Sequence, residues 1–301
     1  MATFAKTGYP AAKYAAHRLP PPPSLFNTVL DYHHGPRKLC VDLGTGHGVA
    51  AHGLANFFPL VLGIDPSEGM LRQAQSQTAS TESGRIEYHQ SVAEDMSFIE
   101  SCTVDLVLAV QAAHWFDPRR IWDELYRIVR PEGTVAFWNW GRYFLIGRPC
   151  ADRVLRMYSD GPEHLGPYWP RPGHTIWNER MRAVECADLS RWEDIARLEY
   201  EPCLESLGAG TGHGVKMFAR LKLSELESLL RTWSSVHEWS VAHPSAIPKA
   251  EGGNGDIIDA LMEEMIHVES DWKEHASRED WREIAVEVET RSILLLARRR
   301  G

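Results

Sequence analysis

A glycine-rich turn directly after a short apolar run is the feature that most constrains the fold of this chain. Residues 39–43 read LCVDL, and residues 44–48 read GTGHG. An apolar run that ends in glycines is typical of a buried parallel strand that turns sharply at its carboxyl end. Glycine has no Cβ, so the backbone of such a turn can approach a ligand closely. We therefore expect a bound ligand at this end of the strand.

The segments after the turn alternate between the two kinds of secondary structure. Further apolar runs suggest strands, and helical patterns lie between several of them; the expected strands are 61–65, 85–89, 104–109 and 134–138. Expected helices cover the stretch after the turn to about residue 57, then 67–77 and 119–129. This alternation predicts an α/β fold of the Rossmann-like kind, with a doubly wound and mostly parallel sheet.

The alternation stops at about residue 140. Residues 141–280 are predicted to be mostly helical or irregular and to form an inserted cap, while 286–288 and 293–297 are predicted to be closing strands, including a C-terminal antiparallel one. Four prolines at 20–23 stiffen the chain, and Ser24 is the expected N-cap of a short helix through Leu30. The predicted organisation is an N-terminal lid at 1–35, a core at 36–140, the cap at 141–280 and core-completing strands at 281–301.

The spacing of the glycines and the acid before them indicate which nucleotide binds. The pattern is Gly-x-Gly-x-Gly, and Val49 stands where a dinucleotide fingerprint has its third glycine. Asp42, two places before Gly44, suits the cationic amino group of a methionine tail and would be poorly placed beside a pyrophosphate. The turn, with Gly46 in its middle, therefore favours S-adenosylmethionine (SAM) over NAD, although a dehydrogenase stays open as an alternative.

Two acidic positions extend this ligand hypothesis. Asp65 ends the second strand about 20 residues after the turn, where an acid pairs with ribose hydroxyls in nucleotide-binding folds. The alternative is that Asp65 caps the next helix, although Ser67 already offers a cap. The loop at 91–98 would hold the adenine, with Glu94 or Asp95 accepting a hydrogen bond from its amino group.

The fourth strand ends in the run QAAHWFD at 111–117, which should point into the site because ligands bind outside the carboxyl ends of the strands. The two alanines leave room for a ligand. We expect His114 and Trp115 to border the reacting groups. A carboxylate acceptor needs no base, whereas a hydroxyl or thiol would need one, for which His114 and His213 are the candidates.

The glycine loop, the GIDPS turn at 63–67 and the QAAHWF run resemble class I SAM-dependent methyltransferases. The subgroup that the chain resembles is the fungal trans-aconitate methyltransferase-like proteins, also through KYAAHRLP at 13–20, GPYW at 166–169 and RTWSS at 231–235. The resemblance implies that SAM is the cofactor, with S-adenosylhomocysteine as product. It implies that two N-terminal residues fold over SAM and that core residues contact it: Tyr14, Arg18, Asp42, Gly44, Asp65, Ala93, Glu94 and Gln111. Relatives often carry Asp where this chain has Val92. We therefore expect Ala93 and Glu94, and not residue 92, to contact the adenine.

The acceptor is less constrained by the sequence. The trans-aconitate relatives make methyl esters, for which arginines are expected, and four are available at 142, 148, 171 and 180. Aromatic residues of the predicted cap, including Trp140, indicate instead a bulkier, partly apolar acceptor. The substrate-binding residues we expect are Trp138, Tyr143, Tyr168, Trp169 and Arg171.

Charge and cysteine content limit the partners. The net charge of −9 disfavours nucleic acid as a substrate. Five cysteines without a CxxC pair suit reduced thiols in the cytoplasm, no stretch suits a membrane span, and no metal-binding spacing is present, so we expect no metal.

We therefore expect a monomeric or homodimeric enzyme that methylates a small molecule, most simply on a carboxylate or hydroxyl oxygen. Two alternatives stay open. One is a SAM-assisted cyclase or lyase that transfers no methyl group, and the other is a non-catalytic SAM-binding regulator.

Overall fold

The computed structural model of the protein describes residues 11–78, 84–186, 188–276 and 281–301. Its strands are β1 (Leu39–Leu43), β2 (Leu60–Asp65), β3 (Arg85–Gln90), β4 (Val104–Val110), β5 (Val129–Ile146), β6 (Trp192–Glu201), β7 (Thr211–Gly212), β8 (Met217–Lys222) and β9 (Ala285–Arg299). Its α-helices are α1 (Ala11–His17), α2 (Pro23–Tyr32), α3 (Val49–Leu54), α4 (Glu68–Gln77), α5 (Ile121–Ile128), α6 (Pro149–Asp160), α7 (Gly173–Asn178), α8 (Leu223–Leu230), α9 (Ser234–Ala242), α10 (Ile257–Val268) and α11 (Ser270–Ala276).

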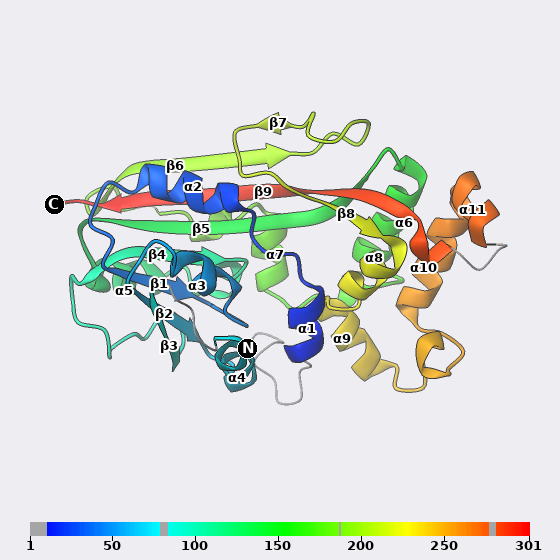
Figure 1. The fold of residues 1–301 in the computed structure, drawn as a ribbon, viewed down its shortest axis with the longest axis horizontal. Coiled ribbons are helices and arrows are strands. Elements are labelled where there is room, and N and C mark those ends of the chain that lie inside the picture. Colours follow the sequence, from blue (N-terminus) through cyan, green and yellow to red (C-terminus); the bar gives the residue numbers. More distant parts are fainter. Residues whose placement is uncertain (1–10, 79–83, 187, 277–280) are drawn as a thin grey trace.

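All nine strands join one sheet in the order β3-β2-β1-β4-β5-β9-β6-β7, with β8 also paired to β9 (Figure 1). Strands β1 to β5 pair in parallel, and β9 runs antiparallel to β5. This topology confirms the predicted Rossmann-like α/β fold with its antiparallel C-terminal strand. The order reverses between β1 and β4, which is where an open parallel sheet binds its ligands.

Both faces of the parallel strands are buried, except at the partly exposed edge strand β3, and alternate residues lie on opposite faces. On one face Val107, Val135 and Phe137 pack with helix α5. On the other, Leu106 and Trp138 pack with α2 and α3. This two-sided burial explains why the strands appear in the sequence as nearly continuous apolar runs.

Strands β5 and β9 continue past β1 to β4 and carry the cap helices (Figure 1), and β8 pairs with the far end of β9. Their pairing runs from Thr134 opposite Arg298 to Ile146 opposite Glu287. The far ends of both strands pack with helices α6, α8 and α10 in a second apolar cluster. The cap helices are thus inserted between two strands of the core sheet and built on an extension of it.

The C-terminal strands differ from the predicted pair, because β9 is one continuous strand. The polar run Glu289 to Ser292 looked like a break between two strands. It lies instead in the buried middle of β9, where Glu289 accepts a hydrogen bond from the Tyr200 hydroxyl at 2.7 Å and Ser292 donates to the Val215 carbonyl. Polar side chains are tolerated in a buried strand when such partners exist.

The segment 141–280, predicted to be mostly helical or irregular, also contains strands β6, β7 and β8 and the end of β5, which the sequence analysis did not predict. One further expectation is wrong. Helix α2 begins at Pro23, so Ser24 lies inside the helix and is not its N-cap. Proline suits the first helical position because its missing N–H would have no partner there. The predicted boundaries between lid, core and cap stay predictions.

Candidate active site

A large cavity of about 370 Å³ opens at the carboxyl ends of β1, β2 and β4. Most of the residues predicted to hold the cofactor line it: Arg18, Asp42, Gly44, Gly46, Asp65, Ala93, Glu94 and Gln111. Tyr14 belongs to helix α1, but its side chain lies outside the described residues. The topology therefore gathers positions that are up to 93 residues apart, from 18 to 111, around one space.

Asp42 places a buried, incompletely paired carboxylate at the end of β1. Its Oδ2 accepts a hydrogen bond from the Thr45 hydroxyl at 2.6 Å, whereas its Oδ1 is buried and has no hydrogen-bond partner among the described residues. Burial raises the pKa of Asp42 to about 7, against the opposing effect of the Thr45 hydrogen bond. A buried carboxylate with a vacant oxygen is costly unless a donor or a cation completes it.

The glycine turn fits closely against the end of β4. The amides of Gly44 and Thr45 both donate to the Ile64 carbonyl, at 2.8 and 2.9 Å. Gly44 has a φ of +73°, and a Cβ on it would lie 2.3 Å from the Cβ of Ala112. A Cβ on Gly46, by contrast, would meet nothing within 4 Å. Gly44 is therefore required by packing, and Gly46 leaves space at the cavity wall.

Asp65 ties the turn to the second strand. One oxygen accepts from the Gly46 amide at 2.9 Å and the other from the Ser67 amide at 2.8 Å. The N-cap of helix α4 is Ser67, whose side chain accepts from the Met70 amide, as the sequence predicts. Asp65 does not replace that cap. Its carboxylate retains lone pairs for a ligand, because each oxygen can accept a second hydrogen bond.

The loop after β3 lines the cavity with side chains that are apolar or already hydrogen-bonded within the protein. Ala93 is buried against the cavity, and Val92 lines it with a half-exposed side chain. Glu94 also lines it, but its Oε1 accepts from the Asp117 amide at 2.6 Å. Asp95 does not line the cavity; its Oδ1 accepts from the Ser97 amide at 3.3 Å. Of the two predicted adenine acceptors, Glu94 is therefore the one at the cavity.

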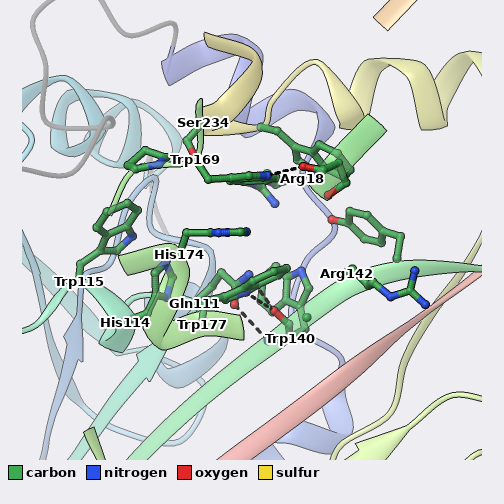
Figure 2. Close-up of a pocket in the computed structure, with 15 residues that line it drawn as sticks. Arg18, Gln111, His114, Trp115, Trp140, Arg142, Trp169, His174, Trp177 and Ser234 are labelled. Carbon is green, nitrogen blue, oxygen red and sulfur yellow. Dashed lines mark hydrogen bonds between the residues drawn. The ribbon is translucent and has the colours of Figure 1, made fainter. Parts of the chain in front are cut away.

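A smaller cavity of about 70 Å³ adjoins the large one and shares Arg18, Gln111, Trp115 and Trp140 with it. Figure 2 shows its lining, which comes from Arg18, from the segment after β4, from β5, and from residues 159–177 and 233–234. Its full lining comprises Arg18, Gln111, His114, Trp115, Trp140, Gly141, Arg142, Tyr143, Ser159, Trp169, Pro170, His174, Trp177, Trp233 and Ser234.

Gln111 and Trp140 form a rigid partition where the two cavities meet. Gln111 has a φ of +56°, which is uncommon for a residue other than glycine. Its side-chain amide donates to the Trp140 carbonyl at 3.1 Å and accepts from the Trp140 amide at 3.0 Å. The Trp177 indole N–H also donates to that carbonyl, at 2.8 Å. This network fixes the position of Trp140 between the cavities.

Two histidines line the small cavity, and burial keeps both neutral. The Nδ1 of His114 lies 2.9 Å from the Asn139 amide nitrogen, and burial lowers the pKa of His114 to about 3. Burial also lowers the pKa of His174 to about 4. His174 stacks on Trp169 at 4.6 Å and on Trp177 at 5.4 Å between ring centroids. Neither of its ring nitrogens, both buried, has a hydrogen-bond partner among the described residues.

Arg142 is the cap arginine that lines the small cavity, and its buried Nη1 has no hydrogen-bond partner among the described residues. It lies 3.6 Å from the fully buried Asp152 and stacks over the Phe144 ring at 4.0 Å. Burial lowers its pKa. Two of the other arginines considered for the acceptor form ion pairs outside the small cavity, Arg148 with Asp271 at 2.7 Å and Arg180 with Glu199 at 2.9 Å.

The structure separates the predicted acceptor-side residues into two groups. His114, Trp115, Tyr143 and Trp169 line the small cavity. Residues outside both cavities are Trp138, Tyr168, Arg171 and His213.

Each residue of the second group has an evident reason for its position. Trp138 is fully buried in the core, and Trp140, two residues further along the same face of β5, takes its place at the site. Tyr168 packs edge-on against His243, and exposed Arg171 donates to Thr175 at 3.2 Å. His213 is exposed.

His174, Trp177 and Trp233 are lining residues that the sequence analysis missed. Each lies in or beside a short helix of the cap, without the periodic pattern or glycine turn that marks a site in the core. A search for aromatic residues near 166–169 could have extended to Trp177. Nothing in the sequence indicates that the His174 ring would be left without a partner.

The polar groups of the large cavity match the parts of SAM. The vacant Asp42 oxygen suits an ammonium group, because a cation completes a buried carboxylate. The remaining acceptor capacity of Asp65 suits two vicinal hydroxyls, and the Gly44 and Gly46 backbone allows close approach. The residues present therefore fit SAM, and the volume of the large cavity is in the range of sites that bind small molecules and cofactors.

Comparisons with known proteins agree with this fit. A family model described as a methyltransferase domain matches residues 41–137. CRG1 of Saccharomyces cerevisiae, named as a SAM-dependent methyltransferase, is 27% identical over 270 residues, which cover 87% of this chain and 89% of CRG1. A Dictyostelium discoideum protein named as a methyltransferase is 31% identical over 230 residues, which cover 76% of this chain and 73% of that protein.

The fold has a solved counterpart. A structure described as a type II methyltransferase from Anaeromyxobacter dehalogenans matches 93% of this chain and 97% of its own, with a TM-score of 0.64 and 22% identity. No helix among the described residues is long and apolar enough to cross a membrane. Sheet order, cavity chemistry and the extent of the sequence match converge, and the chain belongs to the SAM-dependent methyltransferases.

Proposed function

We propose that this methyltransferase transfers the methyl group of SAM to an oxygen of a small-molecule acceptor held in the small cavity. The observation that carries the proposal is the adjacency of the two cavities across Gln111, Trp115 and Trp140. A cavity of about 70 Å³ admits the reacting end of a small molecule, and its aromatic lining excludes water from that end.

In the large cavity, each polar residue would bind a different part of SAM. Asp42 would hold the ammonium group of SAM, Asp65 its ribose hydroxyls and Glu94, with the backbone around Ala93, its adenine. When bound, SAM supplies a methyl group already activated by the attached sulfonium. The protein's contribution is then to align the acceptor and exclude water, an effect that can supply roughly 7–11 kcal/mol.

The acceptor side supplies orientation and a dry environment. Trp115 and Trp140 border both cavities, so they are placed to position the acceptor against the cofactor. Neutral His174 can accept a proton, as a hydroxyl acceptor requires, whereas the bare nitrogen of His114 is the Nδ1 that already faces the Asn139 amide nitrogen. Arg18 and Arg142 give a carboxylate some attraction, which suits an acid of the trans-aconitate kind, although Asp152 offsets Arg142.

Incubation of the purified protein with methyl-labelled SAM and a panel of acids and hydroxyl compounds tests this proposal. We expect label in an ester or ether product and stoichiometric formation of S-adenosylhomocysteine. Conversion of an acceptor without label transfer would support a SAM-assisted cyclase or lyase instead. Binding of S-adenosylhomocysteine with no conversion of any acceptor would support a regulator.

A further inference from the structure

His174 is a polar residue of the small cavity whose two ring nitrogens are both left without a hydrogen bond by the described residues. Its ring is buried, and both Nδ1 and Nε2 lack partners within the described part of the chain. The neighbouring indole N–H groups are already engaged. Trp169 donates to the Ser159 carbonyl at 2.7 Å, and Trp177 donates to the Trp140 carbonyl at 2.8 Å. A buried polar ring without partners costs folding free energy, which favours a role completed by a ligand.

The protonation state of His174 restricts what that ligand can be. A neutral imidazole has one N–H donor and one bare nitrogen that can only accept. A carboxylate has no proton to offer the bare nitrogen, so it leaves that nitrogen unpaired. A hydroxyl group can donate to it, and so complements the ring in its resting state. The depressed pKa of His174, which follows from burial, keeps the ring neutral throughout the physiological range.

The shape of the surrounding wall restricts the acceptor further. The ring planes of His174 and Trp169 are inclined by only 5°, and those of His174 and Trp177 by 24°. Figure 2 shows the His174 ring projecting into the centre of the group of side chains that line the cavity. Nearly parallel aromatic rings favour a flat ligand that stacks alongside them. Asp152, 3.6 Å from Arg142, offsets part of the attraction of that cation for an anion.

From these observations we infer that the acceptor is a compact planar hydroxyl compound, of the phenol or enol class, and that His174 receives its hydroxyl proton. The inference rests on the proposed function and names its substrate class. As the acceptor oxygen forms its bond to the methyl carbon, the carbon–sulfur bond breaks and its electron pair stays on sulfur. The hydroxyl proton passes to the bare nitrogen of His174 and then to water.

His174 is a sufficient base for this step despite its burial. Once the oxygen has given an electron pair to carbon, the remaining O–H bond is that of a protonated ether and is far more acidic than a free hydroxyl. A neutral imidazole within hydrogen-bond reach therefore takes the proton late in the reaction. Positioned general bases contribute about 10²–10⁴-fold to rates, which sets the effect expected on removing the ring nitrogens.

The test compares wild type with His174→Phe, which keeps the aromatic stack and removes both nitrogens. His243→Phe is the matched control, because His243 also stacks on an indole, that of Trp239 at 4.2 Å, but lines neither cavity. His174→Gln is a second variant that keeps polarity should the Phe variant fail to fold. The probes are phenol and catechol, each paired with benzoate as the carboxylate of similar size.

Two readouts are needed. Calorimetry on the S-adenosylhomocysteine complex should show phenol binding to wild type and His243→Phe, and binding at least tenfold weaker to His174→Phe. The affinity for S-adenosylhomocysteine itself should be equal in all three proteins, because His174 does not line the large cavity. Label transfer to phenol or catechol should fall about 100-fold or more in kcat/KM for both His174 variants.

The outcomes separate this inference from the function beneath it. Transfer to benzoate but not to the phenols, unchanged by His174→Phe, would overturn the hydroxyl class while leaving O-methylation standing. Transfer to the phenols that survives both His174 substitutions would overturn the role of His174. Tight S-adenosylhomocysteine binding with transfer to neither class would overturn the proposed function, and this inference with it.

Discussion

The two adjoining cavities differ in how they are built. The large one is formed by the ends of β1 and β2 and the loops after β3 and β4. Its carboxylates are held by nearby groups of these turns, Asp65 by two backbone amides and Asp42 by the Thr45 hydroxyl. The small one is formed by side chains from residues 18 to 234, most of them aromatic, on elements that meet only through the packing of the cap. One site is thus determined by local turns and the other by tertiary packing.

This difference has a physical consequence for mutation. In the large cavity a single backbone position determines the shape, because the turn at Gly44 lies against Ala112 with no room for a side chain. In the small cavity the rings are supported by one another and, at Trp140, by hydrogen bonds from Gln111 and Trp177 to its backbone. Substitutions should therefore act sharply and locally on cofactor binding, and more gradually on acceptor binding unless they remove a reacting group.

Gly44→Ala is the strongest test of the idea that a local turn determines cofactor binding in the large cavity. The new Cβ would lie 2.3 Å from the Cβ of Ala112 at a φ of +73°, so the turn must shift away from β4. We expect affinity for S-adenosylhomocysteine to fall at least 100-fold, measured by calorimetry.

The control for Gly44→Ala is Gly147→Ala. Gly147 has a φ of +70°, but a Cβ there meets nothing within 4 Å. That variant should lose about 1–2 kcal/mol of stability from backbone strain and bind the ligand normally. Normal ligand affinity in Gly44→Ala as well would show that the contact with Ala112 does not constrain the turn.

Asp65→Ala is the next largest effect. Removing the carboxylate deletes two charge-assisted acceptors, and we expect ligand binding to weaken by about 1–3 kcal/mol in calorimetry. Ser67→Ala is the matched control, because it removes the N-cap of α4 without touching the cavity, at a stability cost of about 1 kcal/mol. Comparable losses of affinity in both variants would mean that Asp65 acts by supporting the helix and does not contact the ribose.

The same contrast explains how much could be predicted from the sequence. The parallel core was predictable because most of its strands are apolar runs and helices separate most of them, and because Asp42, Gly44 and Asp65 occupy motif positions at strand ends. The continuity of β9 was not predictable, since the burial of Glu289 depends on Tyr200, a residue 89 positions away.

The small cavity could be predicted only in part. His114 and Trp115 follow a strand directly, so their place was evident. Trp138 was expected at the acceptor and Trp140 was only noted, because alternation places both on one face and cannot say which lies beyond the end of the neighbouring strand. His174 reaches the cavity through the fold of the cap, for which no local pattern exists.

Asp42 gives the cofactor cavity a pH dependence. Its pKa of about 7 means that the carboxylate that should bind the ammonium group is mostly protonated at pH 6 and mostly ionised at pH 8. The competent fraction therefore rises about tenfold between these values, and affinity for S-adenosylhomocysteine should rise with it. Calorimetry across this range should show the rise in wild type and none in Asp42→Asn.

The stability of the unliganded protein should move in the opposite direction. The folded carboxyl keeps its proton up to about pH 7, whereas the unfolded one loses it near pH 4. The folded state binds more protons in this window, so stability falls as pH rises from about 4 to about 7 and the contribution is constant above. An identical slope in Asp42→Asn would assign the effect to other groups.

Trp138→Phe should have the smallest effect on activity. It tests whether the acceptor site ends at the small cavity or extends into the core. Trp138 is fully buried, and its indole N–H has no hydrogen-bond partner among the described residues. The loss of packing should cost about 1–3 kcal/mol in thermal unfolding, softened because an unpaired donor is removed with it. Methyl transfer and the KM for the acceptor should stay within twofold of wild type.

Trp140→Phe is the matching substitution on the same face of β5. In that variant the KM for the acceptor should rise, because Trp140 borders both cavities. A larger change in KM for the Trp138 variant than for the Trp140 variant would mean that the acceptor site extends into the core.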